Sequence, residues 1–254
     1  MSDADYIRSI EERRAREQAA LRRFPSVLSA VARHELPVGS AMRVGPAEAD
    51  LCLPGMARTI RIEALPDGFR LDGEVSGPRS VDAGRYTLRL SHQGYPAIVV
   101  LDREAPVRDV ELRWYPVEPR MRVRATLEPD GSRVAVASTA SGPRPAERAG
   151  WIRFAIDGIA CRVAAVRLVE PGYAEGHLDV FFRDATTGHG SYEVGRYVTV
   201  ERDGSDVVLD FNLAYDPACA LSPYYNCPIP PPENHLAVAI RAGEMTPRDA
   251  AQRH

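Results

Sequence analysis

The sequence predicts a mainly β protein, in which an N-terminal helix is followed by antiparallel β-sandwich or barrel units joined by hairpins. From about residue 40 onward apolar residues alternate with polar ones, which is typical of half-buried strands. The clearest such segments are 60–64, 86–90, 110–114 and 121–125. Asp-Gly dipeptides, which favour tight hairpin turns, occur at 67–68, 130–131, 157–158 and 203–204. Short strands joined by hairpins, without intervening helices, indicate an antiparallel architecture.

The first two dozen residues predict the helix. Ser2 and Asp5 resemble a capping box at its start, and the residues that follow include oppositely charged pairs one turn apart. Ser26 is then expected to cap a second short helix, which starts at Val27 and ends before Pro37.

Breaks in the pattern predict three parts: a helical segment over 1–38, a β-sandwich-like unit over 39–116 and a second β unit over 117–254. The second boundary lies near Pro116 and Pro119, which precede an expected hairpin over 121–137. The polar stretch 141–147 is expected to be a mobile loop within the second unit.

The composition of the chain excludes several classes of function. The chain has 254 residues and a net charge of -3, and no basic block is long enough for a nucleic-acid footprint. No apolar stretch approaches the roughly 18 residues of a membrane span, and the N-terminus is charged, so we expect a cytoplasmic protein. All 32 Lys+Arg residues are arginine. The absence of lysine excludes Schiff-base chemistry and a P-loop, both of which need its amine.

The region 40–115 bears a faint likeness to forkhead-associated domains in its strand order. The phosphate-binding residues of those domains do not carry over, because Pro46 stands where an arginine would follow the glycine. Residues 57–59 likewise replace their Ser-x-x-His segment. The likeness therefore implies a β-sandwich shape and argues against phosphothreonine binding.

The C-terminal block from Phe181 to Glu244 carries a series of ordered motifs. They are Phe-Arg-Asp-Ala-Thr-Thr-Gly at 182–188, Tyr-Glu-Val-Gly-Arg-Tyr at 192–197, Asp-Phe-Asn-Leu-Ala-Tyr-Asp-Pro-Ala-Cys at 210–219, Cys-Pro-Ile-Pro-Pro-Pro-Glu-Asn-His-Leu at 227–236 and Ala-Gly-Glu at 242–244. This block closely resembles a bacterial family known only as domain of unknown function number sixteen eighty-four. Asp216 replaces an asparagine of the family's pattern, and His235 replaces an arginine. The resemblance implies no substrate.

Residues 212–234 of this block form a long, Pro-rich and aromatic loop between strands, and such loops are usually functional when they are ordered. One interpretation is a polar network that fastens the loop as a lid to the β core. The other is a pocket for a small polar or anionic molecule. In that pocket Arg183 or Arg196 would bind an anionic group, and Asp210 or Glu233 would be the general base. Tyr192 and Tyr215 would donate hydrogen bonds. Further ligand-binding candidates are Asp184, Asn212, Asn234 and His235.

The four cysteines do not suggest a metal site. Cys219, Cys227 and His235 are spaced eight apart, but the spacing lacks a paired-ligand knuckle, so we expect no metal and instead a disulfide or two packed thiols. Cys52 and Cys161 lie in apolar runs and are expected in the core. We expect no cofactor. The sequence leaves two functions open: acid/base chemistry or binding at this pocket, or a non-enzymatic module whose C-terminal block is architectural.

Overall fold

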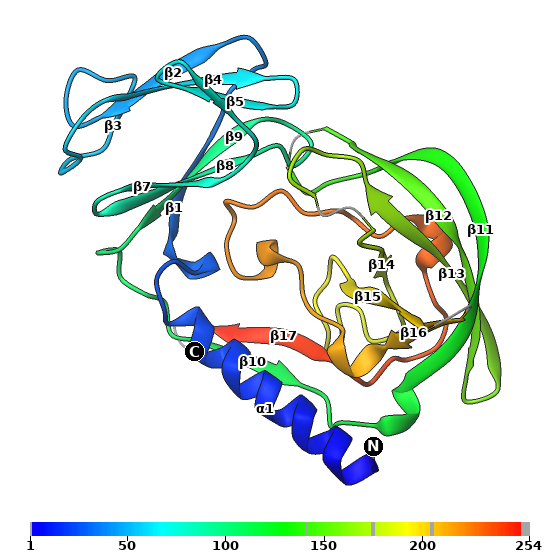
Figure 1. Ribbon diagram of the computed structural model, residues 1–254. Coiled ribbons are helices and arrows are strands. Elements are labelled where there is room, and N and C mark those ends of the chain that lie inside the picture. The colour runs from blue at the N-terminus through cyan, green and yellow to red at the C-terminus, as the bar shows by residue number, and fades with distance from the viewer. Residues whose placement is uncertain (1, 141, 174–175, 204–205, 250–254) are drawn as a thin grey trace.

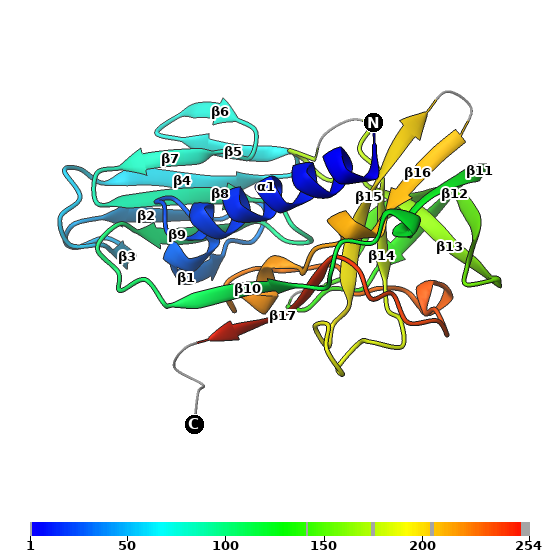
Figure 2. The same ribbon diagram turned by 90° about the horizontal axis from the view of Figure 1, so that it is seen from below.

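The computed structural model describes residues 2–140, 142–173, 176–203 and 206–249 (Figure 1). The protein is mainly β, as predicted, and it has one α-helix, α1 (Asp3–Leu21). Two β units lie side by side, and α1 lies next to the chain at 110–115, to which Arg14 and Gln18 donate hydrogen bonds (Figures 1 and 2). No helix among the described residues is both long enough and apolar enough to cross a membrane.

Helix α1 begins as predicted, because the Ser2 hydroxyl accepts a hydrogen bond from the Asp5 backbone. The expected second helix is wrong. Only a 3₁₀ turn, η1 (Val27–Ser29), forms there, and β1 (Ala30–Glu35) follows it. Strand β1 pairs with β9 (Ala97–Asp102), whose residues are all buried. Pairing with this core strand overrides the local capping signal, because propensity is a weak determinant beside tertiary contacts.

Residues 30–102 form a β-sandwich. One sheet has the order β3 (Leu51–Cys52), β2 (Ala41–Gly45), β4 (Ile60–Leu65), β5 (Gly68–Leu71) and β6 (Glu74–Ser76). The other has the order β1, β9, β8 (Tyr86–Ser91) and β7 (Ser80–Ala83). Alternate residues of both sheets share one core, to which Ile62, Phe69 and Leu88 contribute fully buried side chains. The predicted hairpin at Asp67-Gly68 is present between β4 and β5.

The second unit is a closed six-stranded barrel. Its strands are β11 (Arg122–Val136), β12 (Arg144–Ile156), β13 (Ile159–Leu168), β14 (Asp179–Phe182), β15 (Arg196–Asp203) and β16 (Asp206–Asp210). Inward-facing residues of the strands meet the C-terminal block inside the barrel, where Leu236, Val238 and Ile240 join the core. The block is therefore part of the fold rather than a detachable lid.

Three predictions within this barrel need correction or comment. The hairpin over 121–137 is wrong, because β11 runs straight through Asp130-Gly131, which forms a bulge where β11 pairs with β12. The expected loop over 141–147 is largely strand, since β12 begins at Arg144. A glycine with positive φ, as Gly131 has, fits a bulge as well as a turn. Of the Asp203-Gly204 turn, Gly204 lies outside the described residues.

Two hairpins have both central residues at positive φ, as tight turns of this type require. Asp157 and Gly158, at φ 49° and 78°, join β12 to β13 as predicted. Asp72 and Gly73, at φ 47° and 101°, join β5 to β6 in the same way, at a turn that was not among those predicted.

The segment between the two units is built from distant parts of the chain. Strand β10 (Val110–Trp114) pairs with β17 (Glu244–Asp249), and η2 (Pro119–Met121) leads into the barrel. The loop after β16 contains the turns η3 (Phe211–Leu213), η4 (Ala218–Ala220) and η5 (Pro232–Asn234) and passes between sandwich and barrel (Figure 1). In this loop Tyr225 and Cys227 pack on β9. The division of the chain into units at 38 and 116 stays a prediction.

Candidate functional site

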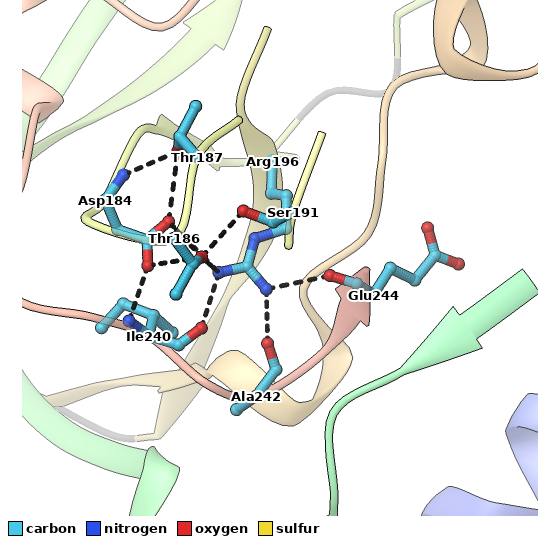
Figure 3. Close-up of polar contacts among 8 residues, drawn as sticks. All are labelled: Asp184, Thr186, Thr187, Ser191, Arg196, Ile240, Ala242 and Glu244. Atoms are coloured by element: carbon cyan, nitrogen blue, oxygen red, sulfur yellow. Dashed lines mark hydrogen bonds and ion pairs between the residues drawn. The ribbon is translucent and has the colours of Figure 1, made fainter. Parts of the chain in front are cut away.

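Arg196, at the start of β15, is the centre of a buried polar network (Figure 3). Its guanidinium donates to the backbone carbonyls of Ala242 at 2.5 Å, Ile240 at 2.7 Å and Glu244 at 3.0 Å. It also donates to the Asp184 carboxylate at 3.4 Å. Its side chain is 1% exposed and packs against the ring of Phe182. These bonds fasten the chain before and at the start of β17 to the barrel.

Asp184 is equally enclosed, since its side chain has no exposed surface. Its carboxylate accepts the backbone N–H of Ile240 at 2.6 Å and the hydroxyls of Thr186 and Thr187 (Figure 3). Asp184 and Arg196, both predicted site residues, are therefore brought together. Their partners are backbone groups and threonines of the same fold, and neither residue lines one of the pockets described below.

Asp210 and Asn212 meet at the other end of the block, where they hold helix α1. Both carboxylate oxygens of Asp210 accept from the Tyr6 hydroxyl at 2.8 Å. The Asn212 amide donates to the same hydroxyl and to the carbonyl of Glu118, and its oxygen accepts the Glu118 N–H. Burial, more than the nearby Asp210 charge, raises the pKa of Tyr6. This cluster joins α1 and η2 to the barrel.

Asn234 fills a gap between β13 and β14, which share only the backbone pair Val166 and Asp179. Its fully buried side chain accepts the N–H of Ala164 at 2.6 Å and donates to the carbonyls of Ala164 at 3.0 Å and Phe181 at 2.8 Å. The amide thus supplies hydrogen bonds that a neighbouring strand would otherwise make.

The other predicted residues lie outside these buried networks. Glu233 and His235 are exposed, and Glu233 forms an ion pair with Arg148 at 3.1 Å. Arg183 is half-buried and donates to the carbonyl of Val194 at 2.9 Å. Tyr215 is partly exposed and stacks edge-on against Tyr197. The structure does not bring these residues into one site with Arg196 and Asp210.

Tyr192 lines a surface pocket of about 390 Å³, whereas Asn212 and Tyr215 line a far smaller hollow of about 10 Å³ under helix α1. The pocket lies between the 188–193 loop and the chain around β10 and β17, and its polar lining includes Arg108, Ser191, Tyr192, Glu193, Thr246 and Asp249. A larger and more open pocket of about 620 Å³ lies between sandwich and barrel, and no predicted site residue lines it.

The polar groups that line the 390 Å³ pocket differ in whether they are already bonded to the protein and so in whether they can bind a ligand. Arg108 is engaged by Asp249 at 2.9 Å and by the carbonyl of Leu221 at 2.7 Å. Tyr192 donates its hydroxyl proton to the carbonyl of Cys219 at 3.4 Å, so its oxygen remains an acceptor. Glu193 is exposed and forms no ion pair within the described part of the chain. The pocket therefore presents mainly hydrogen-bond acceptors.

Two buried carboxyls outside the predicted set have altered acidity. Asp216 is 8% exposed, and neither of its side-chain oxygens has a hydrogen-bond partner within the described residues. Burial, helped by the neighbouring Glu244, raises the pKa of Asp216 to about 8. Burial likewise raises the pKa of Glu244 to about 7, although its carboxylate accepts the Asp216 N–H at 2.6 Å. The sequence signal for this pair was present: Asp216 departs from the asparagine of the family pattern, and Glu244 ends the block.

Replacing Asp216 with asparagine is expected to stabilise the protein at neutral and alkaline pH. An acid whose pKa is raised by folding keeps its proton in the folded state while the unfolded chain loses it, so stability falls as pH rises. For Asp216 this loss extends from about its ordinary pKa, 3.8, to about 8. Each pKa unit corresponds to about 1.4 kcal/mol, so D216N should gain about 2 kcal/mol or more at pH 8 and nothing at pH 3. Denaturant unfolding across this range measures the difference, and parallel pH curves for the two proteins would contradict it.

The cysteines differ from expectation in one case. Cys161 is buried as predicted, but Cys52 is exposed, because β3 is a two-residue edge strand. Cys219 and Cys227 lie together as two free thiols, with the Cys219 N–H donating to the Cys227 sulfur at 3.3 Å. No group of three or more His, Cys, Asp and Glu side chains is placed to hold a metal ion in the ranges that the structure describes.

The chain is similar to a family of uncharacterised proteins and to a solved structure. No curated protein matches the chain. A solution NMR structure of an uncharacterized protein from Haloarcula marismortui is 32% identical, with a TM-score of 0.44, over 56% of this chain and 78% of that one. The family described as "Protein of unknown function (DUF1684)" matches residues 110–245, a segment that includes β10, the barrel and the C-terminal block. The chain therefore belongs to this family.

Proposed function

We propose that the protein binds a small polar molecule, rich in hydrogen-bond donors, in the pocket lined by Tyr192. The observation that carries the proposal is the acceptor-rich lining: the exposed Glu193 carboxylate and the Tyr192 oxygen face a pocket whose one arginine is already engaged. A carboxylate accepts strong hydrogen bonds from an ammonium group. Of the polar and anionic ligands expected from the sequence, this lining favours a neutral or cationic polar one. We expect this binding to take place in the cytoplasm, where the four free thiols would stay reduced.

Titration of ¹⁵N-labelled protein with ethanolamine, and separately with inorganic phosphate, tests this proposal. Ethanolamine should produce saturable shifts of the amide signals of Gly188, Ser191 and Thr246, and phosphate should not. The variant E193Q should weaken ethanolamine binding by about tenfold or more, as expected for a hydrogen bond to a charged group.

The matched control is E74Q, which changes an exposed glutamate of β6 in the sandwich and should leave binding unchanged. The proposal fails if ethanolamine shifts none of these signals, if phosphate shifts them instead, or if E193Q binds like the wild type.

A second candidate function is architectural, and a specific observation favours it. The buried members of the C-terminal block bond to the fold itself: Arg196 to three carbonyls, and Asn234 to both edges of a splayed strand pair. In this role the block serves to hold sandwich, helix and barrel together. The two roles are compatible, because the pocket uses Tyr192 and Glu193, which these networks do not employ.

A further inference from the structure

Cys219 and Cys227 form a closely placed pair of thiols with unequal surroundings. Cys219 lies in η4, and Cys227 lies eight residues further along the same loop. Both thiols are free. The Cys219 backbone N–H donates to the Cys227 sulfur at 3.3 Å, and the Cys227 thiol is the neighbour that most lowers the pKa of Cys219. A disulfide needs the sulfurs to close to about 2 Å. The two side chains are therefore neighbours, and both are reduced.

Cys219 is more exposed to solvent than Cys227. Cys219 is half-buried and adjoins Ala220 and Tyr192, two residues that line the 390 Å³ pocket. Cys227 is 6% exposed and packs against Tyr225 and the buried strand β9. A reagent arriving from solvent therefore meets Cys219 first.

We propose that Cys219 is a reversible oxidation site for hydroperoxides, with Cys227 as the thiol that resolves the oxidised form into a disulfide. This inference rests on the sulfur pair and is independent of the ligand proposed above. It assigns a modification site to two motif residues, in Asp-Pro-Ala-Cys and Cys-Pro-Ile-Pro, that the architectural networks leave unused.

The steps balance. The Cys219 thiolate attacks the terminal oxygen of the hydroperoxide, the O–O bond breaks, and the alkoxide or hydroxide that leaves takes up a proton. Sulfur is oxidised to sulfenic acid and the peroxide is reduced to alcohol or water. The Cys227 sulfur then attacks the Cys219 sulfur, the S–O bond breaks, and hydroxide leaves with the Cys227 proton as water. A small-molecule thiol reverses the disulfide by exchange.

The electrostatic surroundings support these roles. Hydrogen bonding from the Cys227 thiol is the main cause that lowers the pKa of Cys219 to about 7, and the neighbouring hydroxyls of Tyr192 and Thr139 contribute to the same shift. The same hydrogen bond and burial raise the pKa of Cys227. Once Cys219 is oxidised, its charge and this hydrogen bond are lost, so the Cys227 pKa falls back and the resolving step becomes easier.

Two acidic and two basic side chains also lie near the pair. They are Asp216 in the same loop, Glu193 beside Tyr192, Arg144 at the start of β12 and Arg33 on β1. A negative charge on Cys219 raises the pKa of Asp216, so that carboxyl keeps its proton while the thiolate forms.

The test follows oxidation by intact mass and peptide mapping. The reduced wild type, treated with one equivalent of hydrogen peroxide and with dimedone present, should form the 219–227 disulfide and lose two hydrogen masses. The variant C227S should instead trap dimedone on Cys219, and C219S should form neither product. Recovery of both thiols with dithiothreitol completes the expected result.

The pH dependence of thiol alkylation distinguishes a reactive Cys219 from two thiols that only pack together. Alkylation of Cys219 by iodoacetamide should be half-maximal near pH 7, whereas the thiol of a short unstructured cysteine peptide is half-maximal at about pH 8.5. Tyr192→Phe should move the Cys219 midpoint upward. The proposal is overturned if peroxide yields no 219–227 disulfide, if C227S traps no dimedone on Cys219, or if Cys219 shares the pH midpoint of the free peptide.

Discussion

Replacing Arg196 with alanine is expected to lower the free energy of unfolding by about 3–5 kcal/mol, the usual cost of removing one partner from a buried ion pair. The change leaves the Asp184 carboxylate without its cation in a site with no exposed side-chain surface. It also removes the donors to the carbonyls of Ile240, Ala242 and Glu244. Urea unfolding monitored by tryptophan fluorescence measures the loss.

The matched control is R183A, in the same block. Arg183 is half-buried and its side chain donates one hydrogen bond, to Val194, so we expect a cost of about 1 kcal/mol. If R196A does not fold, R196K, which keeps the charge but loses the planar array of donors, should fold with an intermediate loss. An R196A protein as stable as R183A would show that Arg196 is not architectural and would return it to the list of ligand-binding candidates.

The predictable part of the fold is the part fixed by local alternation. Strands β4, β8 and β10 lie where the period of two placed them, because alternate apolar residues of each strand pack into a hydrophobic core. Strand β8 also buries Thr87 and Ser91 on its other face. Barrel closure could not be predicted in the same way. It depends on β11 pairing with β16, as in the register Arg122 to Asp210, across nearly ninety residues that carry no local signal for that pairing.

The candidate residues were predicted by type, whereas their partners were not. Asp184 and Arg196 were both candidates, and they lie 3.4 Å apart, although no local pattern in the sequence predicts that contact. What the sequence could not reveal is that the two terminal guanidinium nitrogens of Arg196 donate to backbone carbonyls at 240–244, because carbonyls are present at every position. Likewise, consecutive residues separate: Asn234 faces inward, whereas its neighbours Glu233 and His235 are exposed.

Replacing Asn234 with alanine is expected to cost about 3 kcal/mol or more. The change leaves the N–H and carbonyl of Ala164 and the carbonyl of Phe181 without partners in a fully buried site, and each such group costs about 1–3 kcal/mol. The strands β13 and β14 cannot close the gap themselves, since they share a single backbone pair. Urea unfolding gives the free energy, and faster hydrogen exchange at the Ala164 amide locates the damage.

The variant N234D separates hydrogen bonding from packing, because the side chain keeps nearly the same size. An ionised carboxylate accepts from Ala164 but cannot donate, and it faces the carbonyls of Ala164 and Phe181. At neutral pH N234D should therefore be at least as unstable as N234A, and acid should restore part of the loss, because a protonated carboxyl donates one hydrogen bond. The exposed neighbour Glu233 supplies the control, E233Q, with an expected cost below about 1 kcal/mol. If N234D unfolds at the wild-type urea concentration at both pH values, the amide is not what joins β13 to β14.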